Sequence, residues 1–157
     1  MNYYKKLPAL SMESYFSNKV TALGYMTFFY PYKTIKDIKI VFSGKFHDNT
    51  LTLKEDYTDN DSKVLRVWSF KKKSNSCYIG KESNVTGTIK VSIYGNKLNM
   101  KYKFKTNYKK IYFNVNVKDS MYLVDKETLI NKTIISKYGI TLAESFLVYK
   151  KLWFFEC

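Results

Sequence analysis

The chain has few of the residues on which most enzyme active sites depend. It contains one histidine and two cysteines among 157 residues. His47 is followed by Asp48 and Asn49, a combination typical of an exposed turn, and Cys77 and Cys157 form no CxxC pair. The sequence therefore lacks the residues that metal-assisted hydrolysis or a Ser-His-Asp triad would need. We predict no catalytic residue, no metal site and no cofactor, and the sequence gives no support for an enzyme.

Long apolar runs are absent as well. No stretch approaches the roughly 20 apolar residues of a membrane-spanning helix, and residues 1–8 contain no apolar segment of the kind found in signal peptides. The sequence also has no lipid-attachment cysteine near its start. As written, it predicts a soluble, cytoplasmic protein.

Arginine is almost missing although the chain is strongly basic. Of its 27 lysine and arginine residues only Arg66 is an arginine. A guanidinium is always charged and holds a carboxylate or phosphate through two parallel hydrogen bonds, which an ammonium group does not do. Arg66 is therefore the leading candidate for a functional residue, with a structural ion pair or plain chance as the alternatives.

The net charge of +14 and the pI near 9.6 would ordinarily suggest nucleic acid or an anionic membrane as a partner. Lys, Asn, Ile, Tyr and Phe are all abundant, however, and all use A/T-rich codons, so genomic composition explains much of the lysine excess. Nucleic acid is not favoured. A basic surface that binds nucleic acid or makes peripheral membrane contact, through Lys97, Lys101 and Lys103, remains the alternative.

What the chain does contain is typical of a β-barrel. Aromatic residues make up 18% of it, with 15 Tyr and 11 Phe, and wide side chains suit a barrel or sandwich interior. Ser11 is the expected N-cap of one short helix at residues 11–16. After it the hydrophobic period is two, as in Ile38, Ile40 and Phe42. We predict one all-β domain over residues 1–157, with an antiparallel up-and-down barrel of about nine or ten strands at 20–150 and an apolar tail at 151–157.

Three hairpins fix the register in more detail. A two-residue turn at Asn60-Asp61 predicts four cross-strand pairs, which are Leu51 with Phe70, Leu53 with Trp68, Glu55 with Arg66 and Tyr57 with Val64. A turn at Gly95-Asn96 pairs Ile93 with Leu98, Val91 with Met100 and Ile89 with Tyr102. A loop around Asn107 and Tyr108 then sets Phe104, Tyr102, Met100 and Leu98 against Ile111, Phe113, Val115 and Val117.

The first register places two opposite charges on the apolar face. Glu55 and Arg66 lie between Leu53 with Trp68 and Tyr57 with Val64, so we expect a buried pair within about 4 Å. Such a pair is poor evidence for stability, because the desolvation of both ions offsets their attraction. It serves either the specificity of the fold or the recognition of a ligand, with Arg66 on an anionic head and aromatic side chains around an apolar tail. Trp68 and Tyr57 belong to the same candidate site.

A second polar site is predicted nearer the end of the chain. Asn131 lies between Ile130 and Lys132, and Glu144 shares a face with Phe146 and other apolar residues. If Asn131 and Glu144 both point inward, they either lock the closing strands by hydrogen bonds or contact a ligand. The segment 152–155 is apolar enough for a membrane or partner anchor, and a last strand explains it equally well.

An ordered series of short motifs supports these predictions from another direction. Its members are Ala22-Leu23-Gly24, Leu53-Lys54-Glu55-Asp56-Tyr57, Arg66-Val67-Trp68, Tyr78-Ile79-Gly80, Val85-Thr86-Gly87, Gly95-Asn96-Lys97-Leu98, Asp119-Ser120-Met121-Tyr122-Leu123-Val124-Asp125, Leu129-Ile130-Asn131-Lys132 and Ser136-Lys137-Tyr138-Gly139. Over residues 15–151 this series resembles the uncharacterised proteobacterial proteins grouped as domain of unknown function thirty-eight thirty-three.

The resemblance implies a small calycin-like or lipocalin-like β-barrel, often an envelope lipoprotein of bacteria, with no established activity. Its members accompany genes for modified fatty acids, which favours a lipid ligand. The chain departs from the family pattern at Ser120 in place of tryptophan, Lys132 in place of arginine and Ala143 in place of glycine. It also lacks the lipid-attachment cysteine, so the envelope location implied by the family conflicts with the cytoplasmic one predicted from the sequence as written.

Together these observations predict non-catalytic binding of an apolar small molecule with an anionic head, such as a fatty acid or lipid, in the barrel interior. The alternatives are the basic-surface binder described above and a protein-interaction subunit without a small ligand. Neither the ligand nor the oligomeric state follows from the sequence.

Overall fold

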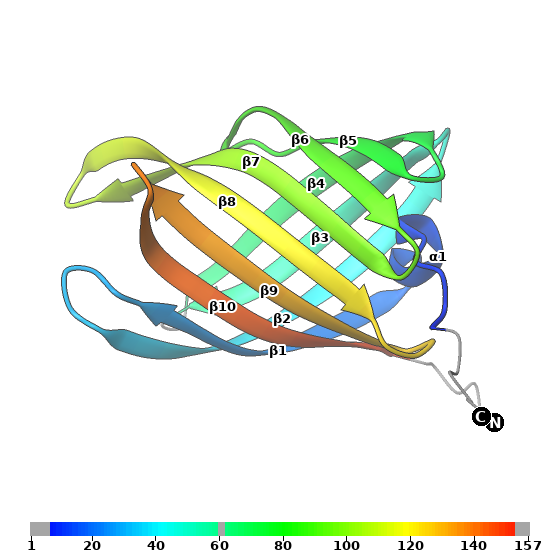
Figure 1. Ribbon diagram of the computed structural model, residues 1–157, viewed down its shortest axis with the longest axis horizontal. Helices are drawn as coiled ribbons and strands as arrows, with labels where there is room; N and C mark the ends of the chain where they lie inside the picture. The colour runs from blue at the N-terminus through cyan, green and yellow to red at the C-terminus, as the bar shows by residue number, and fades with distance from the viewer. Residues whose placement is uncertain (1–6, 60–61, 153–157) are drawn as a thin grey trace.

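The chain folds into ten strands and one short helix, as a computed structural model shows (Figure 1). The structure describes residues 7–59 and 62–152. The elements in chain order are α1 (Met12–Phe16), β1 (Lys19–Phe28), β2 (Thr34–His47), β3 (Thr50–Asp59), β4 (Ser62–Ser74), β5 (Cys77–Lys81), β6 (Val85–Tyr94), β7 (Lys97–Tyr108), β8 (Ile111–Leu123), β9 (Thr128–Lys137) and β10 (Ile140–Lys151).

The strands form a closed antiparallel barrel in which each strand pairs with its sequence neighbours and β1 pairs with β10. Closure gives every strand a neighbour on both sides, although β5 pairs with only part of β4. The predicted all-β, up-and-down barrel with a short N-terminal helix is therefore confirmed. Within the described residues, no helix is long and apolar enough to cross a membrane. The predicted apolar tail lies largely outside the described residues, because these end at 152.

The first predicted register is correct. Leu51, Leu53, Glu55 and Tyr57 of β3 stand opposite Phe70, Trp68, Arg66 and Val64 of β4. The two turn residues themselves, 60 and 61, lie outside the described residues, but Asp59 pairs with Ser62 on either side of them. Glu55 and Arg66 therefore share the inner face of the barrel, as the alternation of the two strands requires.

The second predicted register is correct only near its turn. Ile93 pairs with Leu98 and Val91 with Met100, but the register shifts between Thr86 and Lys90. The predicted pair of Ile89 with Tyr102 is not among the partners that form. Across this shift β6 has two more residues than β7. Gly87 lies in the irregular stretch with φ of +77°, and such an insertion bends the strand. Ile89 still points inward and is fully buried.

The third predicted register is wrong. Phe104 pairs with Val115 and Tyr102 with Val117, not with Ile111 and Phe113. The turn falls at Lys109 and Lys110, both at positive φ, two residues beyond the expected position. Because the resulting shift is an even number of residues, the inner face is preserved. It also brings Asp119 opposite Met100 on that face.

Helix α1 closes one end of the barrel (Figure 1, right). Ser11 caps it through its side chain, as predicted, and Met12, Tyr15 and Phe16 are buried. The Tyr15 hydroxyl donates to the carbonyl of Glu127 at 2.9 Å. At Gly44 a Cβ would come within 1.7 Å of the Phe16 carbonyl oxygen, so the absence of a side chain there lets the helix pack directly on β2.

A charged contact also joins α1 to strands β4 and β5 of the barrel. The Glu13 carboxylate accepts hydrogen bonds from the Lys72 ammonium and the Tyr78 hydroxyl. Burial alone would raise the pKa of Glu13, but these bonds outweigh it and lower the pKa from 4.5 to about 2. The strands reach the opposite end of the barrel without a helix across it in the described part of the chain (Figure 1, left).

The histidine and the cysteine that the structure describes lie away from the interior. His47 ends β2 beside the Asp48-Asn49 turn, where it is exposed and contacts the Asp48 carboxylate at 3.1 Å. Cys77 has a free thiol in β5, and Cys157 is outside the described residues.

Candidate ligand-binding cavity

A cavity of about 490 Å³ occupies the barrel between α1 and the opposite end. Most of its lining is apolar or aromatic, because the inward positions of the strands alternate with polar outward ones. The apolar lining includes Met12, Phe16, Phe28, Ile38, Phe42, Leu53, Phe70, Phe104, Ile135 and Leu147. This size and character lie in the range of small-molecule sites, roughly 300 to 1,000 Å³.

Four of the six predicted site residues meet on one part of this lining. Glu55 and Tyr57 come from β3, and Arg66 and Trp68 from β4. The Trp68 indole N–H donates to Oε2 of Glu55 at 2.6 Å. Trp68 also stacks on Phe70, with 6.4 Å between ring centroids. The tryptophan thus holds the carboxyl group in place on the wall of the cavity.

The expected ion pair between Glu55 and Arg66 is not present among the described residues. The two residues are cross-strand neighbours, but the carboxyl group turns to Trp68 and the guanidinium lies over the Phe104 ring of β7, 4.8 Å from its centroid. Nη1 of Arg66 is buried and has no hydrogen-bond acceptor in the described part of the chain. A buried N–H without a partner costs about 1 to 3 kcal/mol, and more when the group is charged.

The surroundings of Arg66 follow from the shortness of β5. β5 pairs with β4 only from Ser69 onward. On the side of β4 that faces β5, residues 62–68 therefore have no partner strand in the described part of the chain. Here a second cavity of about 310 Å³ is lined by Arg66, Asn84, Phe104, Lys105, Thr106, Asn107 and Tyr112. Arg66 borders both cavities. Arg66 therefore lies beside a gap between β4 and β6, with one cavity on either side of its side chain.

Burial in the cavity raises the pKa of the acidic side chains that line it. Burial raises the pKa of Glu55, against the opposing effects of the Trp68 hydrogen bond and the Arg66 charge, while Glu82 raises it further. Protonation of Glu55 would leave the positive charge of Arg66 without compensation from that side.

A second acidic residue in the cavity was not predicted as a site residue. Asp119 of β8 accepts hydrogen bonds from the Asn131 amide and from the Thr133 hydroxyl, the latter at 3.1 Å. Burial raises the pKa of Asp119 from 3.8 to about 6, although these two hydrogen bonds lower it and Glu55 raises it. The signal was present in the sequence: Asp119 continues by two residues the inward alternation of Val115 and Val117.

The two residues of the second predicted site do not come together. Asn131 points inward, is 1% exposed and lines the cavity. Glu144 is on the outer face of β10, opposite Ile134 of β9, because the inward positions of this strand are Ala143, Ser145, Leu147 and Tyr149. The expectation that Glu144 points inward is wrong, and its outward position leaves Asp119 as the acidic neighbour of Asn131.

The three departures from the family pattern lie outside the Arg66 region. Ser120 points outward from β8 and its hydroxyl lies 3.2 Å from Oδ1 of Asn99. Lys132 lies over the outer Phe146 ring, at 5.3 Å. Ala143 is buried but small. Arg66 thus lines the cavity, whereas Lys132 lies on the outer face of the barrel.

A closed antiparallel barrel, with a cavity inside and a short helix across one end, is a calycin-like fold. The chain belongs to the family described as Protein of unknown function (DUF3833), whose model matches residues 1–151. Among solved structures it is similar to the S-type phycobiliprotein lyase CPES from Guillardia theta, with a TM-score of 0.65 and 9% sequence identity. That similarity covers 92% of this chain and 94% of the lyase. No curated protein matches the sequence.

Proposed function

We propose that the protein binds, without catalysis, one apolar small molecule with an anionic head, such as a fatty acid or another lipid, inside the barrel. The observation that carries the proposal is the buried Nη1 of Arg66, which lacks an acceptor among the described residues at the edge of an apolar cavity. At 9% identity the structural neighbour supports the barrel alone. The ligand class rests on Arg66 and on the lining.

The position of the guanidinium suits a head group better than it suits a structural ion pair. Glu55, the carboxylate nearest in register, is hydrogen-bonded to Trp68 instead. Phe104 lies against one face of the guanidinium, and Nη1 has no acceptor in the described part of the chain. A carboxylate or phosphate would accept those N–H groups in a bidentate arrangement, while the apolar lining would cover a hydrocarbon chain.

The two cavity carboxyl groups add a pH dependence to the proposal. An anionic head would interact unfavourably with ionised Glu55 and Asp119, so binding should favour their protonated forms. Because the pKa of Asp119 is about 6, affinity for an anionic ligand should rise as the pH falls from 8 towards 5. Asp119→Asn should reduce this rise. Titration of a fluorescent fatty acid across this range measures it, and an affinity that falls with falling pH would contradict the proposed charge arrangement.

Native mass spectrometry of the purified protein tests the ligand class. We expect the protein to carry a co-purifying lipid, or to take up one equivalent of an added long-chain fatty acid. The site of binding can be checked in the same samples, because Trp68 lines the cavity and should transfer its excitation to a bound fluorescent acyl probe. The signal should fall in Trp68→Phe. An added fatty acid that leaves the mass spectrum and the transfer signal unchanged would refute the proposal.

The rival function, electrostatic binding of nucleic acid, predicts a different behaviour. Affinity for DNA or RNA would then be high at low salt and would fall by about one logarithmic unit per phosphate contact for each tenfold increase in salt. We expect only weak, sequence-independent binding of this kind. Sub-micromolar binding that survives physiological salt would favour the rival.

A further inference from the structure

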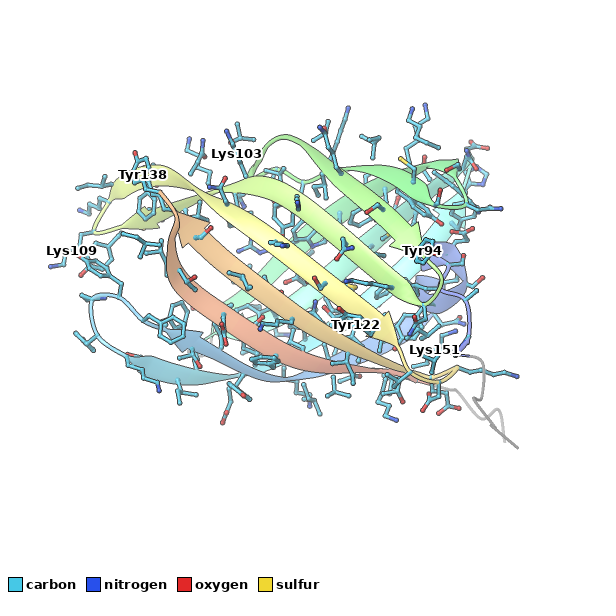
Figure 2. The ribbon with its side chains drawn as sticks, viewed as in Figure 1. Tyr94, Lys103, Lys109, Tyr122, Tyr138 and Lys151 are labelled. Carbon is cyan, nitrogen blue, oxygen red and sulfur yellow. The ribbon has the colours of Figure 1, made fainter. Side chains whose placement is uncertain are left out.

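Three neighbouring connections form one arc at the end of the barrel opposite α1. They join β1 to β2, β9 to β10 and β7 to β8, and the strand order places these hairpins side by side. We call residues 29–35, 105–112 and 137–140 the open rim. Figure 2 shows Lys109 and Tyr138 of this rim at the end of the barrel away from Tyr94 and Lys151.

The open rim exposes large apolar and aromatic side chains. Tyr30 is 72% exposed and Tyr138 is 88% exposed, and other well-exposed members are Tyr32, Ile111, Tyr112 and Ile140. These side chains come from separate loops and strand ends, yet all belong to one end of the molecule. Exposed apolar groups gathered in this way mark an interaction surface rather than scattered surface residues.

The charge of the open rim has one sign. Its three segments contain five lysines, Lys33, Lys105, Lys109, Lys110 and Lys137, and no acidic residue. Several of these lysines lie over rim tyrosines: Lys137 is 4.6 Å from the Tyr138 centroid and Lys105 is 5.4 Å from that of Tyr112. Two other connections of the same end carry acidic residues, with Asp59 at the end of β3 and Glu82 between β5 and β6. Glu82 is buried and hydrogen-bonded within its connection.

Two of the rim turns use residues that the backbone does not favour. Lys109 and Lys110 have φ of 47° and 67°, and Tyr138 has φ of 51°. Asn and Gly adopt such angles at lower cost. At the other end of the barrel, the equivalent turn has Asp48 and Asn49 at positive φ, which are residue types suited to it. The rim thus keeps cationic and aromatic side chains where turn geometry alone favours others.

We propose that the open rim docks on the surface of an anionic bilayer, with the mouth of the cavity turned towards the lipid. Tyrosine rings are suited to the interface between headgroups and acyl chains, and lysines beside them attract anionic headgroups. Charge complementarity selects this partner, because the three rim segments combine exposed aromatic area with five lysines and no acidic residue. The docking does not depend on which molecule the cavity binds, but it would give a lipid ligand a direct route into the barrel.

Sedimentation with vesicles tests the docking. The wild-type protein should bind vesicles of phosphatidylcholine mixed with phosphatidylglycerol, and it should bind vesicles of phosphatidylcholine alone far more weakly. Added salt should weaken the binding, because it screens exposed charges. Wild-type protein that does not sediment with the anionic vesicles at low salt would overturn the proposal.

A paired variant separates the rim from general positive charge. Lys109→Asn with Lys110→Gly removes two rim charges and installs the residues that a turn of this kind prefers, so the melting temperature should be kept or raised. Vesicle affinity should fall at least about tenfold, since each lysine near the surface contributes about 1 kcal/mol. The control, Lys73→Asn with Lys126→Asn, removes two exposed lysines towards the α1 end and should lose much less. Equal losses in both variants would overturn the proposal.

The contribution of the rim tyrosines to vesicle binding can be tested with two equally exposed tyrosines, one at each end of the barrel. Tyr138 and Tyr94 are 88% and 90% exposed at opposite ends of the barrel. Tyr138→Asn should weaken vesicle binding several-fold, and Tyr94→Asn should leave it near the wild-type value. A larger loss in the Tyr94 variant would contradict docking through the rim.

Two further comparisons keep this proposal separate from its rivals. The rim variants should bind a soluble fatty acid in vesicle-free solution as the wild type does, whereas Arg66→Lys should leave vesicle binding unchanged. Failure of the cavity to bind lipid and failure of the rim to dock are thereby distinguishable. If the rim variants instead lose affinity for a polynucleotide, and the wild type ignores anionic vesicles, the rim is a nucleic-acid surface and the membrane proposal is refuted.

Discussion

The two ends of the barrel differ in almost every property that bears on stability and binding. At the α1 end, buried aromatic rings meet the helix: Phe16 packs edge-on against Phe42 and Tyr149, with centroids 6.3 and 6.2 Å away. At the opposite end, the open rim exposes tyrosines and lysines to solvent. The buried contacts at the α1 end therefore stabilise the barrel, whereas the exposed side chains of the open rim are free to contact a partner.

The largest expected effect is on the free energy of unfolding, and it compares one Phe→Ala substitution at each end of the barrel. Phe16 is 1% exposed and Phe29 is 40% exposed. Phe16→Ala should lower the free energy of unfolding by about 3 to 5 kcal/mol, because it removes a buried ring and leaves a larger void. Phe29→Ala should lower it by about 1 kcal/mol or less. Urea denaturation measures both, and similar losses in the two variants would end the assignment of stability to the α1 end.

Substitution of Glu13 should have a smaller effect on the free energy of unfolding, and this effect should depend on pH. Glu13→Gln should lower the free energy of unfolding at pH 7 by about 1.5 to 3 kcal/mol, the range for hydrogen bonds to charged groups. The pKa of Glu13 is lowered to about 2 in the folded protein. The contribution of its charge is therefore complete above about pH 4.5, the unfolded value, and is lost as the pH falls towards 2. Denaturation curves of the two proteins at several pH values should converge in acid. A constant difference would show that the charge is not involved.

Asp119 should behave in the opposite way, because its pKa is raised to about 6. Below pH 3.8 the buried carboxyl group is neutral in both the folded and unfolded states. As the pH rises from about 3.8 to about 6, the unfolded chain ionises before the folded protein does, so the free energy of unfolding falls, and above about pH 6 the loss is complete. Asp119→Asn keeps an acceptor for Asn131 and Thr133, so it should raise the free energy of unfolding at pH 8 by about 1 to 2 kcal/mol. A variant less stable than the wild type at pH 8 would mean that the carboxylate is needed by the fold.

Much of the fold could be predicted because two-residue alternation is a local signal. Leu51, Leu53 and Tyr57 alternate with polar residues, and one turn then fixes all their partners, which the structure confirms. The prediction of the β7–β8 register failed because lysine does not prefer the positive φ that Lys109 and Lys110 adopt.

The prediction that Glu144 points inward failed for a different reason. Both faces of β10 carry apolar side chains, and only closure of the barrel decides that Leu147 and Tyr149 fill the interior.

The candidate site was predictable in position but not in its contacts. The hairpin places Glu55 beside Arg66, and so the sequence predicts that both face inward. Their actual partners depend on rotamers and on β7, which is separated from β4 by two strands. Phe104 contacts the guanidinium at the place where β5 is short and the register of β6 shifts. No single hairpin contains that information.

The central claim is that Arg66 recognises an anionic head inside the barrel, and one comparison tests it most directly. Wild type and Arg66→Lys are each titrated with a long-chain fatty acid and with the matching fatty alcohol, and melting temperatures are recorded for both proteins. The wild type should prefer the acid. In the lysine variant the affinity for the acid should fall at least about tenfold, because a hydrated ammonium cannot replace the bidentate grip. The affinity for the alcohol and the fold should change little. Equal affinity of the wild type for acid and alcohol, or an unchanged preference in Arg66→Lys, would contradict the account.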